Sequence, residues 1–208
     1  MSDRAIDVVC WDWNGTLLDD AEICLRTMND VLVRRGRDPI GSIAAYRTRF
    51  CFPIRDFYAS VGIDGAEFPD AADEYLALLP DRIAAARLHV DALSTVAGIA
   101  DRGVRQVLAS ATLSDVLADQ MRPHALADSF EDVLGIGDAH AASKDAVIAE
   151  WVHDSGVEPE RILLIGDTNH DQEIAERLGA RFVHFAGGHQ HLDAPDRIGA
   201  LSELLDVI

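Results

Sequence analysis

Polar side chains that can bind a metal ion and a phosphate follow the apolar segments of this sequence. Asp12 ends the first apolar run, Ser110 ends the second, and Asp167 ends a later one. Asp171 comes four residues after Asp167, and Lys144, the single lysine beside 17 arginines, opens a helix-like segment. Crowded carboxylates repel one another unless a hard cation such as Mg²⁺, which prefers oxygen ligands, lies among them. An ammonium and a hydroxyl facing that cation suit the negatively charged oxygens of a phosphate.

These residues can meet only if the segments that carry them are strands of one sheet. Amphipathic helices are predicted at 143–154 and 171–178, and a helical stripe of apolar residues runs from 198 to 208. The alternation predicts an α/β fold with a Rossmann-like, doubly wound parallel sheet, in which ligands bind outside the carboxyl ends of the strands. Short apolar runs rich in β-branched residues mark the expected strands at 5–13, 104–111, 132–136, 161–167 and 181–185.

Residues 17–88 break this alternation of strands and helices. Apolar residues recur at helical spacing in a first segment that ends at Gly36. No strand is predicted in this part of the chain. We therefore expect an all-helical cap at 17–88, inserted after the first strand into a core formed by residues 1–16 and 89–208. The remaining helices of the cap are predicted at 43–50, 53–61 and 69–86.

Composition limits the kinds of partner and the location. The 208 residues include 36 acidic and 18 basic side chains, a formal charge of −18, which opposes binding to nucleic acid or anionic membranes. No segment approaches the roughly 20 apolar residues that span a bilayer, and the first residues lack the layout of a signal peptide. Cys10, Cys24 and Cys51 are widely spaced and predict neither a disulfide framework nor a zinc site. We expect a cytoplasmic protein, either a monomer or a small homo-oligomer, with no nucleic-acid or membrane partner.

Four segments of the chain resemble, in order, the four motifs of the haloacid dehalogenase-like (HAD) superfamily. They are Asp12-Trp-Asn-Gly-Thr16-Leu-Leu-Asp19, Ser110, Lys144 and Gly166-Asp-Thr-Asn-His-Asp171. The long helical insertion is similar to the cap of the phosphoglycolate phosphatase-like branch. The resemblance covers the core of nearly the whole chain, and four motifs in register are far more specific than any one of them.

The resemblance implies a role for each of these residues. Asp12 would be the nucleophile that becomes an aspartyl-phosphate, with Asn14 and Lys144 beside it in the catalytic centre. Mg²⁺ would be bound by Asp12, by the backbone carbonyl of Asn14 and by Asp167, with Asp171 behind them. The substrate phosphate would be held by Gly15, Thr16, Ser110, Ala111 and Lys144.

Asn14 departs from the pattern of the family's phosphatases. They usually carry an aspartate at this position as general acid and base, whereas an amide cannot deliver a proton. His189 and Asp19 are candidates for supplying that proton. The main hypothesis is a Mg²⁺-dependent phosphoric monoester hydrolase acting on a small phosphorylated metabolite. The alternative is a phosphate-binding or regulatory protein with little turnover.

Arginines lie among aromatic residues in the expected cap, from Tyr46 to Phe57. A guanidinium can bind a carboxylate or a phosphate through two hydrogen bonds, which makes Arg49 a candidate contact for an anionic substrate. The competing interpretation is a solvated helix face whose phenylalanines pack inward. Sequence alone leaves both open.

Overall fold

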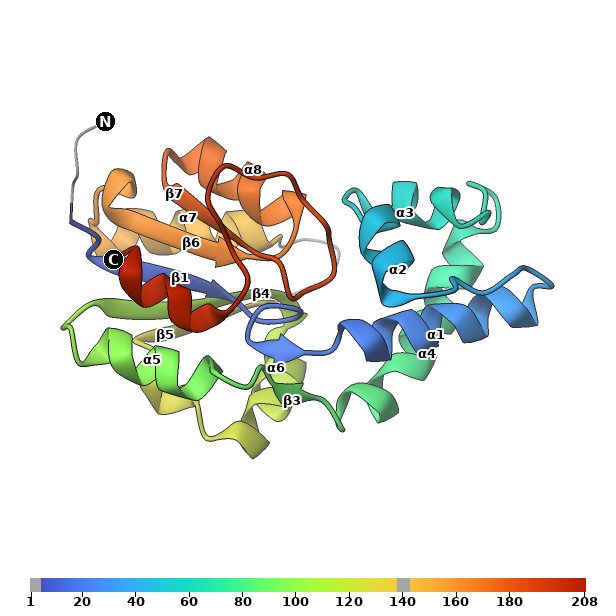
Figure 1. The fold of residues 1–208 in the computed structure, drawn as a ribbon, viewed down its shortest axis with the longest axis horizontal. Coiled ribbons are helices and arrows are strands. Elements are labelled where there is room, and N and C mark those ends of the chain that lie inside the picture. The colour runs from blue at the N-terminus through green and yellow to red at the C-terminus, as the bar shows by residue number, and fades with distance from the viewer. Residues whose placement is uncertain (1–4, 138–142) are drawn as a thin grey trace.

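The computed structural model describes residues 5–137 and 143–208, and six strands within them form one parallel sheet. The expected parallel α/β core is therefore confirmed (Figure 1). The last and shortest strand was not predicted, because two residues are too few to show a pattern. The order of the strands is β5-β4-β1-β6-β7-β8, and their bounds are Val8–Asp12 (β1), Arg105–Leu113 (β4), Asp132–Ile136 (β5), Ile162–Gly166 (β6), Arg181–Phe185 (β7) and Arg197–Ile198 (β8).

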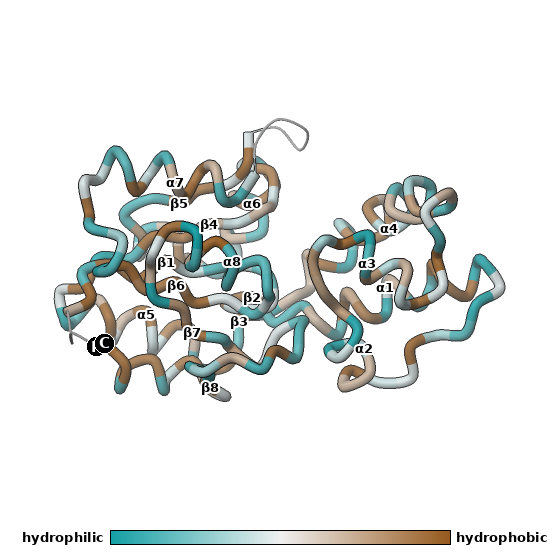
Figure 2. Tube along the Cα trace, turned by 90° about the horizontal axis from the view of Figure 1, so that it is seen from above, coloured by the Kyte–Doolittle hydropathy of each residue, from teal (hydrophilic) through white to brown (hydrophobic). Residues whose placement is uncertain are grey.

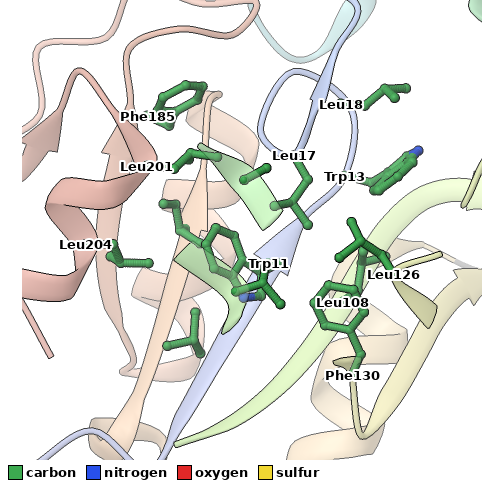
Figure 3. Close-up of a cluster of buried hydrophobic side chains, with 14 of the residues drawn as sticks. Trp11, Trp13, Leu17, Leu18, Leu108, Leu126, Phe130, Phe185, Leu201 and Leu204 are labelled. Atoms are coloured by element: carbon green, nitrogen blue, oxygen red, sulfur yellow. The ribbon is translucent and has the colours of Figure 1, made fainter. Parts of the chain in front are cut away.

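Successive side chains of a strand point to opposite faces of the sheet, and here both sets are apolar. Helices therefore cover both faces. Trp11 faces a core cluster shared with α5 (Ala92–Ala100) and α6 (Ser114–Met121), part of which Figure 3 shows. Cys10 faces a second cluster, shared with α7 (Lys144–Ser155) and α8 (Asn169–Leu178). The predicted C-terminal helix is a short 3-10 helix that packs on the first cluster. The 3-10 helices are η1 (Arg122–His124), η2 (Ala127–Ser129), η3 (Pro159–Arg161) and η4 (Leu201–Asp206).

Four helices between β1 and β4 form a separate layer beyond the carboxyl end of β1 (Figure 1). They pack around their own apolar cluster, in which Met28, Tyr46 and Phe57 are buried. The chain reverses after the first of them at Gly36, whose φ of 70° suits glycine. The expected helical cap segments are thus present, as α1 (Ala21–Arg34), α2 (Ile43–Arg49), α3 (Ile54–Ser60) and α4 (Phe68–Ile83).

Two short strands connect the helical layer to the core, where no strand was expected. β2 (Leu18–Asp19) pairs antiparallel with β3 (Arg87–Leu88). Figure 2 shows this ribbon between the sheet at one end of the molecule and the four helices at the other. Two-residue strands leave no alternating pattern in a sequence, so the expectation of a wholly strand-free insertion was wrong. The domain limits at residues 16 and 88 stay a prediction.

Among the residues that the structure describes, none of the helices has the length and apolar character needed to cross a bilayer.

Candidate active site

Asp12, Asp171 and Lys144 meet at the carboxyl ends of the central strands. Asp12 is the last residue of β1, Lys144 is the first residue of α7, and Asp171 lies in the first turn of α8. The ammonium Nζ of Lys144 lies 2.5 Å from Asp12 Oδ1 and 2.5 Å from Asp171 Oδ1. Each of the three side chains is buried. We call Asp12, Lys144 and Asp171 the lysine cluster.

The opposite charges of the lysine cluster stabilise one another. Burial raises the pKa of Asp12 to about 6, although the Lys144 ammonium opposes this shift. Burial alone would lower the pKa of Lys144, but the two carboxylates outweigh it and raise the pKa above its usual value. At Asp171 burial is likewise outweighed, by Lys144 and by hydrogen bonds from Thr168, so the pKa of Asp171 is lowered. Lys144 therefore remains an ammonium in this site.

A third carboxylate leaves the site with excess negative charge. Asp167 directly follows β6, and oxygens of Asp12, Asp167 and Asp171 lie within 4.8 Å of one another. Burial raises the pKa of Asp167 to about 8, with His189 opposing and the other two carboxylates adding to the shift. When all three carboxylates are ionised, one ammonium offsets only one of their charges. The set of hard oxygen ligands and its uncompensated charge fit a Mg²⁺ ion.

A tight loop after β1 brings backbone amides to the same place. The amide N–H groups of Leu17 and Leu18 donate to the Trp13 carbonyl, at 3.1 and 2.9 Å. Gly15 lies in this loop with a φ of 80°, and a Cβ there would fall 2.3 Å from Asp167 Oδ2. Glycine is therefore required both by the backbone conformation and by the close approach of Asp167. Thr16 reaches Asp167 as well, through a hydroxyl 3.4 Å from its Oδ1.

The end of β4 places a hydroxyl beside this loop. Ser110 is buried, and its Oγ accepts a hydrogen bond from the Thr112 amide at 3.1 Å. Ala111, between them, is exposed. Thr112 donates its own hydroxyl to Asn14 Oδ1 at 3.0 Å and so belongs to the site. Thr112 follows Ser110 by two residues and is a competing hydroxyl in the sequence, and the structure places both there.

The Asn14 side chain is fixed by a carboxylate that the sequence analysis missed. Its Nδ2 donates to Asp20 Oδ2 at 2.9 Å, and the Gly15 amide donates to Asp20 Oδ1 at 2.7 Å. The sequence analysis considered the neighbouring Asp19, which lies exposed on β2. Two consecutive aspartates do not by themselves indicate which one faces inward. The available signal for Asp20 was its position immediately before the apolar stripe of α1, where aspartate caps helices.

His189 contacts Asp20 on one side and the helical layer on the other. Its Nε2 lies 3.1 Å from Asp20 Oδ1, and its Nδ1 lies 3.0 Å from the Tyr46 hydroxyl in α2. Its backbone amide donates to Asp167 Oδ2 at 2.5 Å. Burial would lower the pKa of His189, but Asp20 outweighs it and raises the pKa to about 9. We call Asp20, Tyr46 and His189 the histidine cluster.

Of the arginines on α2, Arg47 rather than Arg49 reaches the core. Arg49 is exposed and donates to the Ala45 carbonyl of its own helix at 3.3 Å. Arg47 donates through Nε to the Gly188 carbonyl at 2.7 Å and through Nη2 to the Gly187 carbonyl. The structure thus brings together the predicted site residues except Arg49 and the exposed Asp19. The contact of Arg49 with substrate stays a prediction.

A second contact between the two layers involves Phe52, which follows α2, and Asn169 of α8. The Phe52 amide donates to Asn169 Oδ1 at 2.9 Å, and Asn169 Nδ2 donates to the Phe52 carbonyl at 3.0 Å. The His191 amide also donates to the Arg47 carbonyl at 2.8 Å. These bonds hold the helical layer against the carboxyl edge of the sheet.

Sequence comparison identifies the family and several similar proteins. The chain matches the model of the haloacid dehalogenase-like hydrolases over residues 9–185. A phosphoglycolate phosphatase of Pseudomonas putida is 26% identical over 197 residues, which cover 88% of this chain and 71% of that protein. A phosphoglycolate phosphatase of Vibrio vulnificus is 28% identical over 129 residues, 58% of this chain. That match spans little more than half of the Vibrio protein, 56% of its length.

Solved structures share the fold. A haloacid dehalogenase-like hydrolase from Streptococcus pneumoniae superposes with a TM-score of 0.81 at 17% identity, covering 97% of this chain and 98% of the other. At this identity the likeness concerns the fold alone. The family match includes the segments that carry Asp12, Ser110, Lys144 and Asp167, and the sequence relatives support the predicted phosphatase class. The chain belongs to the haloacid dehalogenase-like hydrolase family, the one that its four motifs resemble.

Proposed function

We propose that this hydrolase is a Mg²⁺-dependent phosphatase that cleaves a small phosphorylated metabolite through an aspartyl-phosphate at Asp12. The observation that carries the proposal is the set of three buried carboxylates and one ammonium at the end of β1. The phosphoglycolate phosphatases among the relatives support the class of substrate. The expected cytoplasmic location and monomeric or small homo-oligomeric state stay predictions.

Mg²⁺ would be held by Asp12, the backbone carbonyl of Asn14 and Asp167, with Asp171 behind them. Bound there, the ion would offset the charge of the phosphoryl oxygens as they approach the carboxylates. Asp171 accepts bonds from the Thr168 amide and hydroxyl at 3.1 and 2.7 Å, which fix its orientation. The protein therefore presents its oxygens in a preset arrangement.

In the first step a carboxylate oxygen of Asp12 forms a bond to phosphorus, and the bond to the leaving oxygen breaks. Water then attacks the phosphorus of the aspartyl-phosphate, which releases inorganic phosphate and regenerates Asp12. Lys144, already bonded to Asp12, contacts the phosphoryl oxygens together with the Ser110 hydroxyl and the backbone amides of Gly15, Thr16 and Ala111. Splitting the hydrolysis into two displacements is what a carboxylate nucleophile contributes.

Within the part of the chain that the structure describes, no side chain of this site is free to protonate the leaving oxygen. Asn14 carries an amide, and Thr112 and Asp20 occupy both its oxygen and its nitrogen. The ring nitrogens of His189 are both engaged as well, with Asp20 and Tyr46. We therefore expect a preference for leaving groups that are stable without a proton, such as phenolates and acyl groups. The same Asn14 favours the alternative function, a phosphate-binding protein with little turnover.

Hydrolysis of p-nitrophenyl phosphate tests the proposal and separates it from the alternative. We expect turnover with Mg²⁺, none in excess EDTA, and recovery when Mg²⁺ is added back. Phosphate binding measured by calorimetry without turnover of any aryl, acyl or alkyl phosphate would favour the binding protein. Full activity in EDTA would contradict the metal site. A screen of phosphorylated metabolites under the same conditions would then identify the substrate.

A further inference from the structure

A second group of possible metal ligands lies beside the proposed Mg²⁺ site and differs from it in chemistry. It consists of Asp20, Cys24 and His189, and one ligand atom from each lies within 4.8 Å of the others. Asp20 Oδ1 is 3.1 Å from His189 Nε2, and Asp20 Oδ2 is 3.9 Å from Cys24 Sγ. All three residues are buried.

Thiolate, imidazole and carboxylate together are typical ligands of Zn²⁺ and poor ligands of Mg²⁺. Tetrahedral Zn²⁺ with bonds of about 2.0–2.3 Å separates neighbouring ligand atoms by about 3.3–3.6 Å. The two distances, measured from different oxygens of Asp20, lie on either side of this range. Three protein ligands leave the fourth position for water.

Two tyrosines lie beside the possible ligands, and one of them orients the histidine. The Tyr46 hydroxyl is 3.0 Å from His189 Nδ1, the nitrogen that faces away from Asp20. Tyr75 lies near Cys24 and opposes the rise in the pKa of its thiol that burial causes. Histidine ligands of metals almost always use their second nitrogen in such a bond, because it fixes the ring. The Tyr46 contact is the kind of supporting bond that a built metal site uses.

We propose that Asp20, Cys24 and His189 form a Zn²⁺ site that is distinct from the Mg²⁺ site at Asp12, Asp167 and Asp171. Binding displaces one proton from the imidazolium and one from the thiol, so that Zn²⁺ with one thiolate and one carboxylate has no net charge. The expectation of no zinc site rested on cysteine spacing, which cannot detect ligands brought together by the fold.

The proposed Zn²⁺ site lies between the helical layer and the core. Asp20 and Cys24 belong to the start of α1, whereas His189 lies in the loop after β7. Zn²⁺ would therefore tie the helical layer to the core. Since Asp20 also holds Asn14 and the Gly15 amide, Zn²⁺ would reduce turnover even when Mg²⁺ is saturating.

Co²⁺ is a suitable probe, because bonding to a thiolate produces an intense charge-transfer band in the near ultraviolet. We expect one equivalent of Co²⁺, added to the full chain in saturating Mg²⁺, to produce this band and Zn²⁺ to remove it. The Cys24→Ser variant should lack the band. Cys51→Ser and Cys10→Ser serve as matched controls and should retain it. Absence of the band in the wild type, or its loss in a control instead of in Cys24→Ser, would overturn the site.

A competition titration with a chromophoric chelator provides a second measurement that keeps the thiol in place. We expect His189→Gln to bind Zn²⁺ far more weakly than the wild type, and Tyr46→Phe to lose about tenfold in affinity. Wild-type affinity in His189→Gln would contradict the proposal. Both measurements follow metal binding alone, so they remain decisive whether or not the protein proves to be a phosphatase.

Discussion

The lysine cluster and the histidine cluster are two buried ion pairs on either side of the end of β1, and they are built from different parts of the molecule. The lysine cluster comes from β1, α7 and α8, all elements of the core. The histidine cluster joins a core loop to Asp20 at the start of α1 and to Tyr46 in α2. The lysine cluster therefore depends on the core alone. The histidine cluster forms only while the helical layer contacts the core.

This difference assigns separate tasks to the two clusters. Lys144 contacts the proposed nucleophile Asp12 and would face the proposed phosphate, so its loss would remove a charge from the proposed catalytic centre. Asp20 contacts Asn14 and Gly15 in the loop beside the nucleophile, so its loss changes how that loop is held. Substitutions in the lysine cluster should have large effects on chemistry, and those in the histidine cluster smaller effects that depend on the helical layer.

The largest effect is expected for Asp12→Asn, which removes the nucleophile of the lysine cluster. Loss of a residue that forms the covalent intermediate lowers kcat by about 10⁴-fold or more. The measurement is p-nitrophenyl phosphate turnover with saturating Mg²⁺, with circular dichroism as the control for folding. Turnover close to that of the wild type would exclude the covalent mechanism.

Lys144→Met should destabilise the protein as well as inactivate it. Removing one partner of a buried ion pair costs about 3–5 kcal/mol, because the remaining charges lose their compensation. The free energy of unfolding in urea should fall by this amount without Mg²⁺ and recover in part when Mg²⁺ is added. Arg177→Met is the control: Arg177 pairs with Asp145 at the surface, where such a loss is at most about 1 kcal/mol. Equal losses in the two variants would show that burial of the lysine cluster is unimportant.

Two substitutions can reverse the direction of the hydrogen bond between residues 14 and 20. Asn14→Asp alone places a carboxylate against Asp20 Oδ2, where Asn14 Nδ2 now lies 2.9 Å away. Adding Asp20→Asn turns that acceptor into a donor and keeps Oδ1 for the Gly15 amide and His189. We expect the double variant to gain up to about 10²-fold in turnover of alkyl phosphates, because a general acid is restored.

The double variant should gain much less in turnover of p-nitrophenyl phosphate, since the leaving group of this substrate is stable without a proton. The single Asn14→Asp variant should be less stable than the double variant and should gain less. Equal gains on both substrates, or a full gain in the single variant, would show that a residue other than Asn14 controls the proton.

The smallest effect is expected for Tyr46→Phe, which removes one hydrogen bond from the histidine cluster. The buried His189 Nδ1 loses its partner, which costs about 1–3 kcal/mol. The free energy of unfolding in urea should fall by less than in Lys144→Met. A loss as large as in Lys144→Met would indicate that the helical layer stabilises the core as strongly as the lysine cluster does.

The lysine cluster was predictable from the sequence because each of its residues marks the boundary of a recognisable element. Asp12 ends an apolar run, and Lys144 and Asp171 lie at the start of amphipathic helices. A parallel sheet gathers such boundaries at one edge, so their meeting follows from the fold class.

The histidine cluster was not predictable in the same way. Asp20 differs from Asp19 only by one position, and the two-residue strand β2 decides which of them points outward. Arg47 and Arg49 lie on different faces of α2, and packing of Tyr46 into the cap decides which face meets the core. Such choices depend on how two layers dock, which hydrophobic periodicity does not encode.

The burial of Lys144 also has a consequence for chemical labelling. It is the single lysine of the chain, and its ammonium is shared between Asp12 and Asp171. An ε-amine acylates only when unprotonated and accessible, so lysine-directed reagents should spare Lys144 in the folded protein and modify it once the carboxylates separate from the amine. The rate of acylation at this one side chain would thus record how often the catalytic centre opens, without any introduced probe.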